Sequence, residues 1–126
     1  MDDRRDYRIV TQLVTGALGV ATVNYEPPSG TDVRILSAIG YTDRAAGLVD
    51  GQFRFGDTGT EIRITDLIAA AVGAYVHLYA QAPVRECLVI HRNMQLQFVS
   101  AAIAAGERNY LIVVGEIRKG VQPYVA

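Results

Sequence analysis

The triplet Asp57-Thr58-Gly59 matches the signature of aspartic proteases, in which two such aspartates share one proton. The chain length also suits a retroviral-type protease, which builds the pair from two copies. However, Gly56 stands where the protease pattern has an apolar residue, and residues 113–116 read Val-Val-Gly-Glu where the pattern has Gly-Arg or Gly-Asn after the apolar pair. Gly, Asp and Thr are also typical of tight turns. We therefore predict a turn at residues 56–59, with an aspartic protease as an alternative.

Other reactive side chains lack the spacing that catalysis or metal binding requires. His77 and His91 are the two histidines of the chain and lie in separate segments, without the close spacing of a zinc site. Ser37 and Ser100 lie outside any Gly-x-Ser-x-Gly elbow. The Gly-x-x-Gly at residues 16–19 is too short to hold a phosphate. The sequence thus predicts no catalytic residue, no cofactor and no metal site.

Tyrosine is frequent, with seven residues against three phenylalanines and no tryptophan. Tyrosine combines a large apolar ring with a polar tip, so it anchors protein contacts, although it also caps the edges of sandwiches. The charged N-terminal segment, which includes Arg4, Arg5 and Arg8, is predicted either to lie on a partner as an ordered arm or to fray. The predicted partner-binding residues come from this segment, one loop and the C-terminus: Arg4, Arg5, Tyr7, Arg8, Tyr41, Arg44 and Tyr124.

The amino-acid composition limits the classes of protein to which the chain can belong. The chain of 126 residues is half apolar and one-fifth charged, as expected of one globular domain. Its net charge is −1 with dispersed basic residues, so we expect no nucleic-acid partner. Cys87 is the single cysteine, so no disulfide can form within the chain. Residues 1–6 are too charged for a signal peptide and no segment is long enough to span a bilayer, so we expect no membrane partner and a start in the cytosol.

Short stretches rich in Val, Ile and Tyr alternate with Gly, Pro, Asn and Asp, which is typical of β-sandwiches and barrels. One or two helical turns are plausible at residues 65–73, which are rich in alanine, with Thr65 or Asp66 as cap. The segment 86–90 is expected to form a hairpin with 94–98 through a turn at 91–93, and 61–64 to pair with 52–55. The predicted strands cover residues 7–14, 20–25, 33–39, 52–55, 61–64, 75–79, 86–90, 94–98 and 110–114, and further turns are predicted at residues 27–30 and 105–109. Residues 110–114 are continuously apolar, as expected of a central strand covered on both faces.

These elements predict an all-β fold, an antiparallel two-sheet β-sandwich that is jelly-roll-like, with at most one short helix. A parallel sheet is excluded because the helical crossovers that it needs are missing. The predicted organisation is an N-terminal arm at residues 1–6, flexible or bound to a partner, a single sandwich domain at residues 7–119 and a peripheral C-terminal tail at residues 120–126.

The order of the strands resembles that of the small jelly-roll decoration, or cement, proteins on the heads of tailed bacteriophages. The resemblance rests on three stretches, residues 28–37, 83–98 and 105–117. It implies a homotrimer in the virion, present in the host cytoplasm during assembly, that bridges subunits of the major capsid protein. Many modest contacts repeated by symmetry would then give avidity. Alternatives are a phage neck, tail or fibre component and, through exposed tyrosines, a glycan-binding sandwich.

Overall fold

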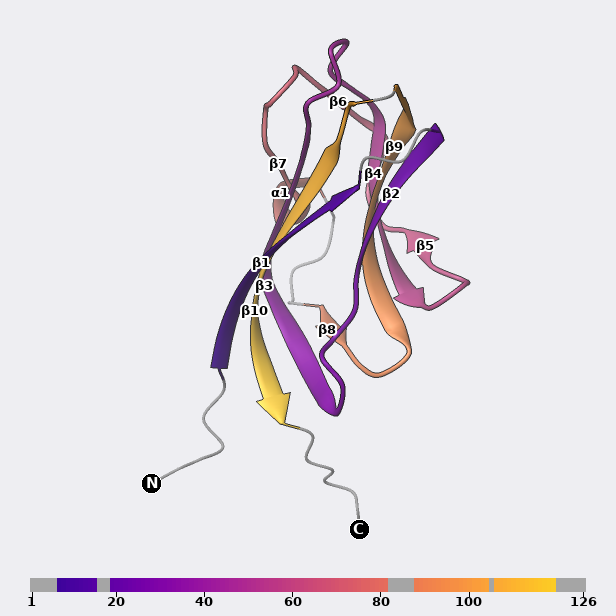
Figure 1. The fold of residues 1–126 in the computed structure, drawn as a ribbon. Helices are drawn as coiled ribbons and strands as arrows, with labels where there is room; N and C mark the ends of the chain where they lie inside the picture. The colour runs from indigo at the N-terminus through magenta and orange to yellow at the C-terminus, as the bar shows by residue number, and fades with distance from the viewer. Residues whose placement is uncertain (1–6, 16–18, 82–87, 105, 120–126) are drawn as a thin grey trace.

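The computed structural model describes residues 7–15, 19–81, 88–104 and 106–119, which form two antiparallel β-sheets packed face to face (Figure 1). The predicted all-β two-sheet sandwich with one short helix is therefore confirmed. The first sheet contains β1 (Tyr7–Thr15), β3 (Thr31–Thr42), β7 (Val76–His77), β8 (Val89–Ile90) and β10 (Asn109–Lys119). The second contains β2 (Gly19–Tyr25), β4 (Leu48–Asp57), β5 (Ile62–Arg63), β6 (Ile68–Ala70) and β9 (Met94–Ile103).

The strand order brings distant parts of the chain together. The first sheet runs β1-β10-β3-β7, and the second runs β2-β9-β4-β5. The long strands β3 and β4 each pair with two short strands on their outer side: β8 and β7 pair with β3, and β5 and β6 with β4. Edge strands this short offer little template for another chain to pair with, which limits edge-to-edge aggregation.

The core lies between the sheets, where alternate side chains of each strand point inward. Val33, Ile35 and Leu111 of the first sheet are fully buried against Phe53 and Phe98 of the second. Gly40 of β3 lies against Phe98 of β9 across the core, where a Cβ atom would lie only 2.5 Å from Cε1 of Phe98. This position therefore requires glycine, because any side chain would displace the Phe98 ring.

Four predicted turns are confirmed by hydrogen bonds between backbone groups. Thr31 N–H donates to Pro28 O (3.1 Å), and Thr60 N–H donates to Asp57 O (2.9 Å). Met94 N–H donates to His91 O (3.1 Å), and Glu107 N–H donates to Ala104 O (3.0 Å). The predicted pairing of residues 61–64 with 52–55 is also confirmed, because β5 pairs with Arg54 and Phe55 of β4.

The predicted helical turns at residues 65–73 are wrong. The segment contains β6, and Ile68 pairs with Gly51 of β4 and is buried. Thr65 does not cap a helix, since its Oγ1 accepts a hydrogen bond from Phe53 N–H at 3.1 Å. An isolated run of alanines is too short to repay helix nucleation, so tertiary contacts decide its conformation.

The short helix instead lies at α1 (Leu78–Gln81), where the alternating pattern of residues 75–79 predicts a strand. Only Val76 and His77 of that segment pair with β3. Leu78 is fully buried, and Tyr79 bonds to β3 through its hydroxyl. Among the described residues, no helix is long and apolar enough to cross a membrane.

The predicted hairpin between residues 86–90 and 94–98 is also wrong, although its turn is present. Strand β8 pairs with β3, whereas β9 pairs with β2 and β4 in the other sheet. The turn at residues 91–93 thus carries the chain from one sheet to the other, and Ile90 and Leu96 are both fully buried in the core. Alternating apolar and polar side chains are compatible with a hairpin and equally with a turn that leads from one sheet to the other. The sequence pattern therefore does not distinguish the two arrangements.

Candidate protein-binding surface

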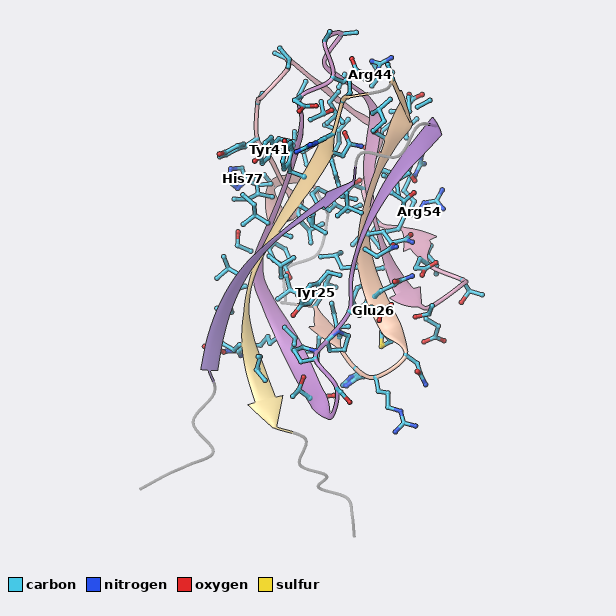
Figure 2. All side chains as sticks on the ribbon, in the orientation of Figure 1. Tyr25, Glu26, Tyr41, Arg44, Arg54 and His77 are labelled. Carbon is cyan, nitrogen blue, oxygen red and sulfur yellow. The ribbon has the colours of Figure 1, made fainter. Side chains whose placement is uncertain are left out.

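The outer faces of the two sheets differ in chemistry. Figure 2 shows Tyr41 and His77 on the outside of the first sheet, Arg54 on the outside of the second and Tyr25 between them. The outer side of the second sheet, which we call the polar face, comprises Thr22, Asn24, Gln52, Arg54 and Gln97. The outer side of the first sheet, which we call the tyrosine face, comprises Ile39, Tyr41, Tyr75, Tyr110, Ile112 and Val114.

Side chains of the polar face form hydrogen bonds with one another. Asn24, Gln97 and Arg54 form one row across β2, β9 and β4. Gln97 Nε2 donates to Asn24 Oδ1 at 2.8 Å, and Arg54 Nε donates to Gln52 Oε1 at 2.8 Å. The apolar Val99, which lies opposite Thr22 and Gln52, is only 8 % exposed. This face is therefore suited to contact with water.

The tyrosine face is apolar and carries a ladder of rings. Tyr110 lies directly opposite Tyr41 in the pairing of β10 with β3, and the two rings stack with centroids 4.5 Å apart and planes 7° apart. Tyr75 packs on the other side of Tyr41, with centroids 4.9 Å apart and planes 43° apart. Stacked rings of this kind are rigid and present apolar area at low entropic cost, as interface anchors do.

The strand β10 was predicted to be covered on both faces, and the structure corrects this. β10 is central in its sheet, between β1 and β3. Its inward residues Leu111 and Val113 are fully buried, whereas Ile112 and Val114 on the outer face are half-buried. The continuous apolar run from Tyr110 to Val114 therefore serves both the core and the tyrosine face.

A second apolar feature adjoins the tyrosine face at one end of the sandwich. We call residues 66–75 the apolar loop. Leu67, Val72 and Tyr75 are 51 %, 53 % and 57 % exposed, and they supply three of the six exposed large apolar side chains among the described residues. Gly73 N–H donates to Thr42 O (2.9 Å), which fixes the loop beside the end of β3. The loop and the tyrosine face meet at Tyr75.

Arg44 lies at the same end of the molecule (Figure 2), in the connection between β3 and β4. Its guanidinium group is engaged within the chain: Nε donates to Ala102 O and Nη1 donates to Gly47 O, each at 3.2 Å. The carboxylate of Glu107 accepts hydrogen bonds from the N–H groups of Ala104 and Ala45, at 2.7 and 3.0 Å. Those two bonds, with the nearby positive charge of Arg44, lower the pKa of Glu107. Arg44 thus helps hold the loops that flank the apolar loop.

The structure brings together only some of the predicted partner-binding residues. Tyr41 and Arg44 share one end of the sandwich, whereas the backbones of Tyr7 and Arg8 pair with Ile117 and Glu116 toward the other end of β10. Arg4, Arg5 and Tyr124 lie outside the described residues. Tyr110 was not among the predicted anchors, because only the register of β10 against β3 reveals that its ring lies on Tyr41.

Asp57 lies in the predicted turn at the end of β4 and is exposed. Nearby, the turns at residues 26–31 and 92–94, together with Thr58, surround an open hollow of about 450 Å³. His91 Nδ1 lies 3.2 Å from Asp32 Oδ2 on the surface close to this hollow. Within the part of the chain that the structure describes, no group of three or more His, Cys, Asp or Glu residues could hold a metal ion.

No protein-family model and no curated protein sequence matches the chain.

Proposed function

We propose that this chain is a virion structural protein that decorates and stabilises the head of a tailed phage by bridging subunits of the major capsid protein. The observation that carries the proposal is the apolar loop, in which Leu67, Val72 and Tyr75 are all exposed within ten residues of the chain. Clustered exposed apolar residues are typical of protein contact sites.

The strand order supports a jelly roll, the architecture of many capsid proteins. In a jelly roll, one sheet has the first, last and third strands side by side in that order. The facing sheet has the second, penultimate and fourth strands side by side in that order. Here β1 lies beside β10 and β10 beside β3, while β2 lies beside β9 and β9 beside β4. The resemblance of residues 28–37, 83–98 and 105–117 to phage decoration proteins points to the same architecture.

The position of the apolar loop suits attachment to a lattice. The loop runs from the edge of β4 to the end of β3, so the broad faces of both sheets stay largely available while this side of the sandwich sits on the capsid. A contact of a few apolar side chains is weak by itself, but a homo-oligomer presents several loops at once and gains avidity from their simultaneous binding. Such repeated contacts hold neighbouring capsid subunits together.

The direct experiment mixes the purified chain with undecorated heads and, separately, with tails of the phage whose genome encodes it, followed by sedimentation. We expect the chain to sediment with heads and to raise the temperature at which they release DNA. The variants Leu67→Asp and Val72→Asp should weaken binding to heads at least about tenfold, because each places a charge in the apolar contact. Ile62→Asp is the matched control, since Ile62 is 68 % exposed on β5, outside the loop.

Two results would contradict the proposal. Binding to tails and not to heads would assign the chain to another part of the virion. Equal binding by Leu67→Asp, Val72→Asp and the parent would show that the apolar loop does not carry the contact.

A further inference from the structure

We infer that the tyrosine face is the surface through which copies of this chain associate with one another. The inference rests on the proposed function for its expectation of a homo-oligomer, and it identifies the surface that builds that oligomer. Leu67 and Val72 of the apolar loop then remain available to face the capsid.

Charged groups lie at the two ends of the tyrosine face. At one end Arg34 of β3 forms an ion pair with Glu116 of β10, and at the other the Tyr110 hydroxyl lies 3.4 Å from Asp43 Oδ2. Between these ends the paired rows of β3 and β10 are Ser37 with Val114, Ile39 with Ile112 and Tyr41 with Tyr110.

The absence of charge from these three rows favours a second copy as the occupant. None of the six side chains that β3 and β10 contribute to them is charged, so the face offers nothing that selects a strongly charged partner. Two copies can bring such faces into contact without repulsion between like charges.

The size of the face fits the centre of such a contact. From Glu116 to Tyr110 the face runs about 20 Å along β10, at about 3.4 Å per residue. Strands about 4.8 Å apart give β3, β10 and the adjoining Tyr75 a combined width of about 14 Å, or a projected area of about 300 Å². A stable contact buries about 800 Å² per partner, with an apolar centre and a polar rim. The exposed His77, together with Arg34 and Glu116, lies where that rim would be.

The contrast between the two sheets points to the tyrosine face as the buried one. Both sheets contribute to the same core, and both have central strands flanked on each side, so packing within one copy does not require their outer faces to differ. The polar face pairs its own amide groups and suits water, whereas the tyrosine face leaves Ile112 and Val114 half-buried. A second copy removes those apolar groups from water, which is favourable in proportion to the area covered.

The test measures the mass of the purified chain in solution, without phage particles, by light scattering and sedimentation. We expect the parent to be an oligomer. Ile112→Lys should raise the concentration at which the oligomer dissociates by at least about tenfold, because the new charge lies at the centre of the face. Gln97→Lys is the matched control, since it places the same charge on the central strand of the polar face and should leave the oligomer intact. Circular dichroism and the melting temperature establish that each variant is folded.

Tyr75→Asp keeps the test decisive if Ile112→Lys does not fold, because Tyr75 lies in a loop and is 57 % exposed. It should also dissociate the oligomer. A monomeric parent would overturn the inference, as would folded variants that associate as strongly as the parent. A chain that oligomerises through this face yet ignores phage heads would defeat the proposed function alone, whereas a monomer that binds heads would defeat this inference alone.

Discussion

The hydroxyl group of Tyr79 donates a hydrogen bond to the carbonyl oxygen of Ile35, 2.9 Å away, and so ties α1 to the middle of β3. The same hydroxyl accepts a hydrogen bond from Leu88 N–H, also at 2.9 Å. Ile35 N–H in turn donates to Leu88 O at 2.8 Å. One side chain therefore holds together three segments that are separated by 44 residues between Tyr79 and Ile35 and by nine between Tyr79 and Leu88.

Tyr79→Phe should lower the free energy of unfolding by about 1–3 kcal/mol, because it leaves a backbone donor and a backbone acceptor without their partner. Urea denaturation at neutral pH measures the change. Tyr75→Phe is the control, since Tyr75 is exposed and its ring contact with Tyr41 survives the change, so its stability should match that of the parent. Equal stability of both variants would mean that the Tyr79 hydroxyl does not anchor β8.

Tyr25 presents the opposite situation, because its buried hydroxyl has no hydrogen-bond partner among the described residues. Burial raises the pKa of Tyr25 from 10.0 to about 12. The unfolded chain therefore releases this proton at a lower pH than the folded chain does. The contribution of this group to stability is complete below pH 10 and is lost as the pH rises toward about 12.

Tyr25→Phe should leave stability at pH 7 unchanged or raise it by up to about 1 kcal/mol, because it removes an unsatisfied buried polar group without opening a large cavity. Above pH 10 the stability of the variant should fall less steeply than that of the parent. Denaturant titrations between pH 7 and pH 11 measure both effects. A clear loss of stability at pH 7 would show that the hydroxyl has a partner after all.

Glu107 should make the fold sensitive to acid. Hydrogen bonds from the N–H groups of Ala104 and Ala45 lower its pKa from 4.5, and the charge of Arg44 acts in the same direction. As the pH falls, the unfolded chain binds this proton first, so the contribution of Glu107 is present above pH 4.5 and is lost as the pH falls through the lower pKa of the folded state.

Glu107→Gln should therefore be less stable than the parent at pH 7, and the difference should shrink as the pH is lowered below 4.5. Denaturant unfolding of both proteins at a series of pH values between 7 and 3 gives the difference directly. Glu26→Gln is the matched control, since it removes a carboxylate at the opposite end of the sandwich (Figure 2). A difference for Glu107→Gln that does not change with pH would contradict the role of its charge.

The sequence by itself determined the class of fold and the places where the chain turns. Alternation of apolar residues indicates strands with one buried side, and residues such as Pro28, Gly30 and Asn93 favour turns through their own backbone preferences. Gly30 and Asn93 indeed have φ angles of 77° and 66°. These signals act over a few residues, so they can be read without knowing what packs against them.

Only the tertiary structure decided which strands are neighbours and which side chains meet. The alternation in residues 94–98 shows that one side is buried, but it does not reveal that β9 pairs with β2 and β4 while β8 pairs with β3. The stacking of Tyr41 on Tyr110 likewise depends on the register between two strands that are far apart in the chain. Pairing of distant strands is selected by the packing of the whole core, and local sequence patterns carry no information about that choice.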